Sequence, residues 1–359
     1  MIAEDRPTRV GIVGCGDVTN LYLPGTAPFT SIELVACTDL DADRAAALSA
    51  RGGFPAVSLE ELLADPTIDI VLVLTPPVAH AAVSRAAIAA GKHVYTEKPL
   101  ATTRADAAAI LAEAATAGVR VGAAPDTFLG GGLQTARALI DEGAIGKPLA
   151  ASASVAHLGP ERWHPNPGTF YATGGGPLLD LGPYYVTALV SLLGPIAAVS
   201  AVGRGTGSER EIATGTRAGT KVMSEVPTTV IGTLSFESGV VGGLTASFDV
   251  VGSQVPSLEF HGTAGSLSLG DPNTFDGEVR YRALGADAWE DVPLRFDGSV
   301  ERGIGLADLI AGIRSGRPHR ASGELAFHVL DVLLALEAAT SSRHEESVRS
   351  RCRRPAALD

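Results

Sequence analysis

Apolar runs and helical stretches alternate in the first third of the chain. Five short apolar runs, partly β-branched and bounded by turn residues, are separated by alanine-rich segments with helical spacing. The runs are Val10–Val13, Leu34–Cys37, Ile70–Leu74, His93–Tyr95 and Arg120–Ala123. Because strands that alternate with helices form parallel sheets with helices on both faces, we expect an α/β domain at residues 1–123.

The rest of the chain, residues 124–359, has a different pattern. Helical spacing returns in four segments: 131–142, 180–193, 304–315 and 323–339. Strand-like alternation occupies 150–156, 196–203, 229–236, 240–250, 257–262, 267–269 and 278–282. Short turns such as Ser238-Gly239 join these runs, which predicts a second α/β domain with a mainly antiparallel sheet. The glycine-rich stretch 204–225 predicts a mobile loop, and the tail from Ser341 predicts a partly disordered segment.

Length, composition and charge exclude several function classes. With 359 residues, 45% hydrophobic and 19% charged, the chain is long enough for two ordered domains. Its net charge of −12 repels phosphate backbones and anionic lipids, so neither nucleic acid nor a membrane is an expected partner. The sequence has no run of eighteen apolar residues, which predicts that no transmembrane helix is present.

The first seven residues and the cysteines bear on the compartment. Residues 1–7 lack the basic and then apolar pattern of a signal peptide. The three cysteines, Cys15, Cys37 and Cys352, are scattered and suggest neither a disulfide framework nor a metal cluster. We therefore expect a cytoplasmic protein that binds no metal.

A glycine-rich turn follows the first predicted strand, in the segment Gly14-Cys15-Gly16-Asp17-Val18. The first glycine permits a tight turn, and Gly16 lets the backbone approach a pyrophosphate at a helix N-terminus. Thr19 stands where a third glycine or alanine is typical of dinucleotide-binding turns. The turn therefore indicates a dinucleotide site, with a purely structural turn as the alternative.

Asp39 ends the second predicted strand. A carboxylate at this place can accept hydrogen bonds from the hydroxyls of an adenosine ribose, and it repels a 2′-phosphate. The next residue, Leu40, supplies no compensating positive charge. We therefore expect NAD rather than NADP, although Asp39 could also be a helix N-cap, a role for which Asp41 is better placed.

Two later strands end in further candidate residues. The third strand leads into Thr75-Pro76 and His80, and the fourth leads into Glu97-Lys98-Pro99. Because the carboxyl ends of parallel strands form the ligand crevice, these segments should lie near the cofactor, with Lys98 beside the nicotinamide. The alternatives are that His80 is a helix-surface residue and that Lys98 is a surface lysine on a loop.

The second domain offers a carboxylate and a phenol. Asp180 and Tyr184 are four residues apart at the start of a predicted helix, so their side chains should share one face. The glycines at 174–176 precede them and are interpreted as permitting close approach to a ligand. Asp180 could instead be an N-cap, and Tyr184 could instead belong to the core.

A polar and aromatic loop leads into this glycine segment. Arg162, Trp163, His164 and Asn166 combine hydrogen-bond donors with an aromatic plate, which is a plausible sugar-facing set. A solvent loop with one buried tryptophan is the alternative. His328 lies on an apolar helix and is interpreted as a structural residue.

Together these motifs resemble the Gfo/Idh/MocA oxidoreductases. The resemblance covers nearly the whole chain and is carried by Gly14-Cys15-Gly16, Asp39, Thr75-Pro76 with His80, Glu97-Lys98-Pro99, Gly174–Tyr184 and Ala264–Leu267. It implies an N-terminal Rossmann domain with a doubly wound parallel sheet, and a C-terminal α/β domain with an open, mainly antiparallel sheet. It also implies a homodimer or homotetramer assembled through the exposed face of that second sheet.

The resemblance further implies roles for individual residues. The family's catalytic lysine falls on Lys98 and its carboxylate on Asp180, whereas its usual histidine is replaced by Tyr184. Some members look similar in carrying tyrosine at that place. We expect an NAD-dependent dehydrogenase that moves a hydride between nicotinamide C4 and a secondary alcohol of a sugar, sugar derivative or cyclitol, with Lys98 and Tyr184 exchanging the proton. The alternatives are a lyase or glycosidase that uses bound NAD transiently, and a non-catalytic NAD-binding sensor.

Overall fold

The computed structural model describes residues 6–297 and 299–358, and its contacts divide the chain into two compact units. The first unit comprises the described residues up to Leu129 together with Ser299–Phe327, and the second comprises the rest. The return of Ser299–Phe327 to the first unit has no counterpart in the sequence-based division at residue 123. Most of the segment considered for a signal peptide, residues 1–5, lies outside the described residues.

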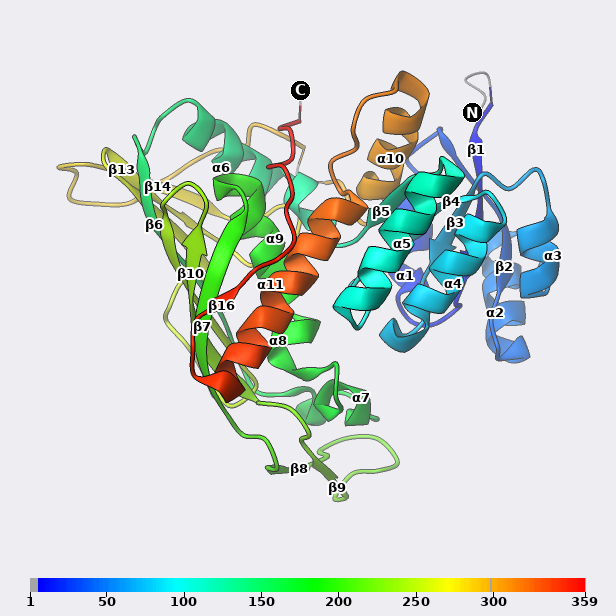
Figure 1. Cartoon of the computed structure of the whole chain (residues 1–359), viewed down its shortest axis with the longest axis horizontal. Helices are drawn as coiled ribbons and strands as arrows, with labels where there is room; N and C mark the ends of the chain where they lie inside the picture. Colours follow the sequence, from blue (N-terminus) through cyan, green and yellow to red (C-terminus); the bar gives the residue numbers. More distant parts are fainter. Residues whose placement is uncertain (1–5, 298, 359) are drawn as a thin grey trace. The chain divides into compact units, whose positions relative to one another are not determined.

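The first unit is built on a five-stranded parallel sheet with the order β2-β1-β3-β4-β5 (Figure 1). Its strands are β1 (Thr8–Val13), β2 (Ile32–Thr38), β3 (Ile70–Val73), β4 (His93–Thr96) and β5 (Val121–Ala123). Its helices are α1 (Thr19–Thr26), α2 (Ala42–Gly52), α3 (Leu59–Ala64), α4 (Pro77–Ala89), α5 (Arg104–Ala117) and α10 (Ile304–Ser315). The strand order changes direction at β1, so the carboxyl end of β1 marks the ligand crevice of a doubly wound sheet. This confirms the predicted fold class of the first domain.

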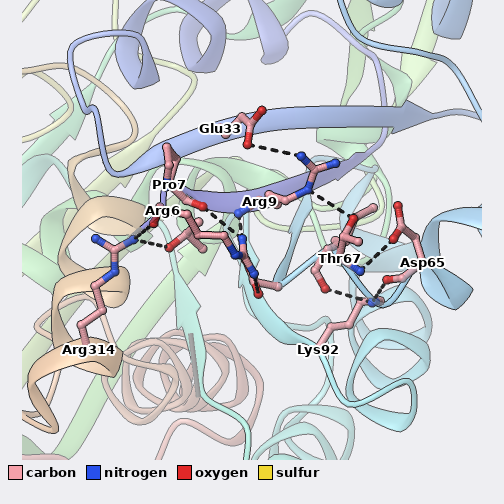
Figure 2. Close-up of polar contacts among 11 residues, drawn as sticks. Arg6, Pro7, Arg9, Glu33, Asp65, Thr67, Lys92 and Arg314 are labelled. Atoms are coloured by element: carbon pink, nitrogen blue, oxygen red, sulfur yellow. Dashed lines mark hydrogen bonds and ion pairs between the residues drawn. The ribbon is translucent and has the colours of Figure 1, made fainter. Parts of the chain in front are cut away.

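Polar contacts at the opposite, amino-terminal edge of this sheet join β1 to the returning segment (Figure 2). The guanidinium of Arg6 pairs with Asp69 at 2.8 Å, and the backbone N–H of Arg9 donates to the same carboxylate at 2.9 Å. Arg314 of α10 donates to the carbonyl oxygen of Arg6 at 2.7 Å. These contacts hold the first unit together at the edge away from the glycine-rich turn.

The second unit contains a nine-stranded sheet with the order β15-β14-β13-β12-β6-β11-β10-β7-β16. Its strands are β6 (Pro148–Ala156), β7 (Ile196–Arg204), β10 (Thr229–Phe236), β11 (Val241–Ser247), β12 (Leu258–Gly262), β13 (Gly265–Leu269), β14 (Val279–Ala283), β15 (Glu290–Asp291) and β16 (Glu346–Ser347). Only the pairing of β6 with β11 is parallel among these described strands, so the predicted mainly antiparallel sheet is confirmed.

Helices pack on one face of this second sheet. They are α6 (Gly131–Asp141), α8 (Gly176–Asp180), α9 (Gly182–Leu193) and α11 (Gly323–Ser342), the last of which begins in the first unit. The short helix α7 (Gly168–Tyr171) packs against α8 instead. Every residue of α9 is buried, which matches its continuous apolar sequence. Gly232 of β10 leaves room for Leu336 of α11, because an added Cβ would lie 2.5 Å from that side chain.

Helix α11 is the one helix among the described residues that is long and apolar enough to cross a membrane by length and composition. About half of that stretch, 56%, is buried within the protein. His328 and Asp331 are fully buried on it and are hydrogen-bonded to Ser350. The helix therefore has the features of a core helix, and His328 has the structural role that its position predicts.

Two segments contain strands and long-range contacts that the sequence did not predict, and their mobility stays a prediction. Residues 204–225 contain the hairpin β8 (Glu209–Glu211) and β9 (Lys221–Met223), and Arg210 on it pairs with Asp249 at 2.7 Å. The tail beyond Ser341 includes β16, and Asp331 accepts hydrogen bonds from the backbone of residues 349 and 350. Both findings have one physical cause: partners far away in the sequence satisfy polar groups that look unpaired locally.

Buried and half-buried histidines make the stability of the fold pH-dependent. Burial lowers the pKa of His80, His319 and His328, and it lowers that of His93 from 6.5 to about 4. Between these two values the unfolded chain binds more protons, so the free energy of unfolding falls as pH falls from 6.5 toward 4. His93 alone should contribute ~3 kcal/mol to this loss.

Urea unfolding at about pH 7 and about pH 4.5 measures this effect. The variant His93→Asn keeps an acceptor for the backbone N–H of Arg120, which lies 2.8 Å from the ring, but it does not titrate. We expect a smaller difference between the two pH values for this variant than for the natural chain. An equal difference in both proteins would mean that His93 does not carry the effect.

Candidate active site

Gly14 opens the turn after β1 and is required by the fold itself. Its φ of +100° lies in the region that favours glycine, and an added Cβ would lie 2.6 Å from the backbone carbonyl carbon of Leu74. Its N–H donates to the carbonyl oxygen of Thr38 at 2.9 Å. The turn is therefore packed tightly between the ends of β2 and β3.

Gly16 has a different environment. A Cβ added there would meet no protein atom within 4 Å, so packing does not demand glycine at this position. Thr19, at the place of the third glycine, is buried, and its hydroxyl donates to the carbonyl oxygen of Gly16 at 2.7 Å. Asp17 is exposed, and Val18 is the N-cap residue of α1, a position with no side-chain cap. The backbone here is open to a ligand next to a helix N-terminus.

Asp39 connects the end of β2 to the glycine-rich turn. One carboxylate oxygen accepts a hydrogen bond from the N–H of Cys15 at 2.7 Å, and the other accepts one from the N–H of Asp41 at 2.9 Å. Asp41, and not Asp39, is the N-cap of α2. The N-cap alternative for Asp39 is thereby excluded, and its half-buried carboxylate lies beside the turn.

His80 is fully buried in α4 and bridges two strand-end loops. Its Nδ1 lies 2.7 Å from the carbonyl oxygen of Pro99, and its Nε2 lies 2.8 Å from that of Thr75. Burial lowers the pKa of the ring. His80 is therefore not a helix-surface residue, because both ring nitrogens face backbone carbonyls.

The hydroxyl of Thr75 has no hydrogen-bond partner among the described residues, although the oxygen is buried. Pro76, the next residue, is exposed and is the N-cap residue of α4. A buried hydroxyl without a partner is costly in a folded protein unless another group satisfies it. Thr75 therefore marks a place where a polar group is missing at the carboxyl end of β3.

Glu97 and Lys98 follow β4 and have distinct environments. Glu97 is buried, and its carboxylate accepts from the Tyr22 hydroxyl at 2.9 Å and from the backbone N–H of Lys98 at 3.0 Å. Lys98 is half-buried. Sequence reasoning did not select Tyr22, since nothing local in α1 signals a partner that lies 75 residues away.

The sheet order arranges the candidate residues of the first unit along one edge. Asp39, Gly16, Thr75 and Lys98 follow the ends of β2, β1, β3 and β4, and these four strands are neighbours in that order. Adjacent strands lie roughly 4.8 Å apart. The structure therefore places four groups in this spatial order along one edge of the sheet: a carboxylate, an open glycine turn, a hydroxyl without a partner among the described residues, and a lysine.

In the second unit, Asp180 and Tyr184 lie on two helices and not on one. Asp180 is the last residue of α8, Leu181 is the N-cap residue of α9, and Tyr184 is in the first turn of α9. The prediction of one continuous helix from Asp180 is wrong at this point, because Leu181 interrupts it, whereas the expectation that the two side chains share one face stays a prediction. The alternative that Asp180 caps the helix is also excluded. Asp180 is half-buried and Tyr184 is 5% exposed.

The glycines at 174–176, the last of which is the first residue of α8, are explained by local backbone geometry. Gly174 and Gly176 have φ values of +87° and +79°. A Cβ on Gly175 would lie 2.7 Å from the carbonyl oxygen of Thr169. The backbone therefore requires glycine here for its own conformation, and the interpretation that these glycines permit close approach of a ligand stays a prediction.

The loop before the glycines presents an exposed aromatic group. Trp163 is 61% exposed and makes edge contacts with His164 and Phe170, with ring centroids 5.5 and 6.1 Å apart. Arg162 is also exposed. The alternative of a buried tryptophan is therefore wrong. Asn166 accepts a hydrogen bond from Arg217 of the 204–225 hairpin segment at 2.6 Å, so the hairpin supports this loop.

Comparisons with known proteins agree with this geometry. Residues 8–124 match a family model described as "Oxidoreductase family, NAD-binding Rossmann fold", and residues 133–268 match "GFO/IDH/MocA C-terminal domain". The chain is 32% identical to 1,5-anhydro-D-fructose reductase of Ensifer adhaerens over 72% of this chain and 74% of that protein. It is 29% identical to trans-1,2-dihydrobenzene-1,2-diol dehydrogenase of Bos taurus over 74% of each chain.

Two solved structures are also similar to this chain. The NAD binding oxidoreductase from Klebsiella pneumoniae superimposes with a TM-score of 0.83 and 25% identity, covering 95% of this chain and 99% of that one. Levoglucosan dehydrogenase in complex with NADH shares the fold, with a TM-score of 0.81 at 22% identity, covering 96% of this chain and 100% of that one. The fold, the family models and the relatives agree: the chain belongs to the Gfo/Idh/MocA family of oxidoreductases.

Proposed function

We propose that this oxidoreductase is an NAD-dependent dehydrogenase that moves a hydride between nicotinamide C4 and a secondary alcohol of a sugar, sugar derivative or cyclitol. The observation that carries the proposal is the order of Asp39, Gly16, Thr75 and Lys98 along the edge of the first sheet. A dinucleotide laid along that edge meets a ribose acceptor, a phosphate-binding turn, a free hydroxyl and a lysine in turn. The relatives described above are named for reactions on sugars and dihydrodiols, which supports the substrate class.

The residues present fit such a cofactor. Gly16 has open space where a Cβ would be, as expected for a backbone that a diphosphate approaches closely. The buried hydroxyl of Thr75 has no partner among the described residues, and a polar group of the cofactor would satisfy it. When bound, the nicotinamide supplies the hydride acceptor, and the protein supplies binding, orientation and charge.

Lys98 and Tyr184 are proposed to exchange the proton of the reacting hydroxyl. The ammonium of Lys98 donates hydrogen bonds and carries a positive charge, which favours the alkoxide that forms when the hydroxyl loses its proton and that becomes the carbonyl as the hydride leaves. The phenol of Tyr184 takes the place that histidine usually has in the family. Asp180 accepts a hydrogen bond from a neighbouring hydroxyl of the substrate and so orients it.

Trp163 is proposed to stack on the apolar face of the substrate ring. Its side chain is exposed, and edge contacts with His164 and Phe170 fix its plane. Arg162, His164 and Asn166 supply hydrogen-bonding groups on the same loop. This arrangement suits a polyhydroxylated ring, which offers both C–H and hydroxyl groups.

A homodimer or homotetramer is proposed as the working assembly. Val202 of β7 and Ile231 of β10 are paired neighbours in the second sheet, and both are more than half exposed. Apolar side chains that gather on an open sheet face are typical of an interface. Light scattering of the purified protein measures the number of subunits, and a monomer at high concentration would contradict this assembly.

Asp39 should set the choice between NAD and NADP. The variant Asp39→Asn removes the negative charge and keeps one of the two acceptor oxygens that hold Cys15 and Asp41. We expect the ratio of kcat/KM for NADP to that for NAD to rise by about tenfold or more, because repulsion of the 2′-phosphate is lost. Asp41→Asn, which changes a neighbouring carboxylate that caps α2, is the matched control and should leave the ratio unchanged. An unchanged ratio in Asp39→Asn would mean that the carboxylate does not face the ribose.

A panel of sugars and cyclitols tests the proposed function. The enzyme is mixed with NAD and each compound, and both NADH absorbance and the organic product are measured. We expect net NADH in proportion to the oxidised product for at least one compound. Product without net NADH would indicate a lyase or glycosidase that uses NAD transiently, and NAD binding without product would indicate a sensor.

A further inference from the structure

Buried side chains hold the Lys98 loop from two sides. We propose that Tyr22 and His80 are positioning residues that fix the backbone of Lys98 for the reaction, an inference that rests on the proposed role of this lysine. Neither side chain needs to touch substrate or cofactor. One acts on the residue before Lys98 and the other on the residue after it.

Tyr22 acts through Glu97. The Tyr22 side chain is 1% exposed, and its hydroxyl donates to Oε1 of Glu97 at 2.9 Å. The other oxygen of that carboxylate, Oε2, accepts a hydrogen bond from the backbone N–H of Lys98 at 3.0 Å. Burial, and then the Glu97 carboxylate, raise the pKa of Tyr22, so the hydroxyl keeps its proton and stays a donor. A single carboxylate thus ties helix α1 to the backbone of the lysine.

The burial of Glu97 makes this tie strong. Its side chain is 7% exposed, so few water molecules can replace a lost partner. Hydrogen bonds to a buried carboxylate are stronger than bonds between neutral groups, and a buried carboxylate that loses a donor is penalised. Removal of the Tyr22 hydroxyl should therefore displace the Glu97 carboxylate and, with it, the N–H of Lys98.

His80 acts from the other side through Pro99. The ring lies between the carbonyl oxygens of Thr75 and Pro99, at 2.8 and 2.7 Å, and is fully buried. It therefore joins the loop after β3 to the loop after β4, which carries Lys98. A neutral imidazole donates from one nitrogen only, whereas an imidazolium donates from both. The charges of Glu97 and Lys98 act on the pKa of the ring in opposite directions, since the carboxylate raises it and the ammonium lowers it.

Placement of Lys98 matters because its side chain is long. Fixing the backbone on both sides limits the positions that the ammonium can reach, and a misplacement of about 1 Å can cost roughly a hundredfold in rate. We call the two contacts, Tyr22 with Glu97 and His80 with Pro99, the clamp. Loss of one of these contacts should therefore lower kcat and leave NAD affinity nearly unchanged. Loss of a residue with only a structural role would change stability without separating the effect on kcat from the effect on NAD affinity.

The test compares Tyr22→Phe with Tyr95→Phe in the full-length enzyme. Tyr95 is also a fully buried tyrosine of the first unit, and its hydroxyl has no hydrogen-bond partner among the described residues. Both variants lose one buried phenol oxygen, but only the first loses the contact to Glu97. We expect kcat to fall about tenfold in Tyr22→Phe, with the Kd for NAD within about twofold and a displaced pH profile of kcat. Tyr95→Phe should match the natural enzyme.

A double-mutant cycle with Lys98→Ala separates positioning from general damage. If Tyr22 acts through Lys98, the pair Tyr22→Phe and Lys98→Ala should have the kcat of Lys98→Ala alone. His80→Gln serves as the second variant, in case Tyr22→Phe does not fold, and it should show the same lack of additivity. NAD binding by each variant reports that the first unit is folded.

The outcomes distinguish this proposal from the proposed function. Additive losses in the cycle, or an unchanged kcat and pH profile in both Tyr22→Phe and His80→Gln, would overturn the clamp while Lys98 kept its role. An unchanged kcat in Lys98→Ala would overturn the proposed function itself. Equal losses in Tyr22→Phe and Tyr95→Phe would also overturn the clamp, because among the described residues the Tyr95 hydroxyl makes no hydrogen bond to Glu97.

Discussion

Replacing Lys98 by alanine should lower kcat by about a thousandfold while NAD still binds. Lys98 follows the end of β4, next to the strand whose end carries Thr75, and is proposed to polarise the reacting oxygen. The contacts that form the dinucleotide turn, such as those of Gly14 and Asp39, do not involve its side chain. The Kd for NAD, from fluorescence titration, should therefore change by less than about threefold.

Lys147→Ala is the matched control for this prediction. Lys147 is an exposed lysine of the second unit, and its removal should leave both kcat and the Kd for NAD unchanged. Lys98→Arg keeps the positive charge but changes the shape and the donor directions, so most of the loss in kcat should persist. A Lys98→Ala variant with the kcat of the natural enzyme would contradict the assignment of Lys98 to proton exchange.

The two glycines of the turn should respond in opposite ways to the same substitution. Gly14→Ala should destabilise the first unit by about 3 kcal/mol and abolish NAD binding, since its φ is unfavourable for alanine and its Cβ would overlap the backbone of Leu74. Gly16→Ala should leave the free energy of unfolding within about 0.5 kcal/mol, because its Cβ points into open space. The same Cβ should nevertheless weaken NAD binding by about tenfold or more.

Urea unfolding and NAD titration on both variants measure these effects. Each variant is the control for the other, since the substitution is identical and the positions are two residues apart. If Gly16→Ala binds NAD as tightly as the natural chain, the space beside Gly16 does not receive the cofactor. If Gly14→Ala is as stable as the natural chain, the close packing against Leu74 has been overestimated.

Much of the fold follows from short-range patterns. The run Thr229–Phe236 alternates apolar and polar residues and is a strand with the same bounds. Ser58 and Glu61 form a capping box, and their spacing of three residues is the local pattern typical of a helix N-terminus. In these cases residues a few positions apart determine the outcome, so one sequence is sufficient to predict it.

The predictions failed where the structure depends on residues far apart in the sequence or on local backbone dihedral angles. The stretch 204–225 is polar and aperiodic, but Arg210 within it binds Asp249, and no local pattern predicts that pair. The break at Leu181 separates α8 from α9, although apolar residues continue through it. Tertiary contacts and local dihedral angles decided these points, and sequence periodicity contains neither.

The positions of the candidate residues after strand ends could be predicted from the sequence, but their contacts could not. Strand ends indicated Gly16, Asp39, Thr75 and Lys98, because parallel strands present their carboxyl ends at one edge. The bridging position of His80 depends on carbonyl groups of two separate loops. Backbone acceptors have no sequence signature, so this kind of contact becomes visible only in the folded chain.

Hydride transfer is tested most directly with a substrate that carries deuterium on its alcohol carbon. The compound from the panel that gives the most NADH is deuterated at that carbon, and the nicotinamide product is examined by mass spectrometry and NMR. We predict one deuterium at nicotinamide C4 for each molecule of alcohol oxidised. Oxidised product accompanied by NADH without deuterium at C4 would contradict direct transfer between substrate and cofactor.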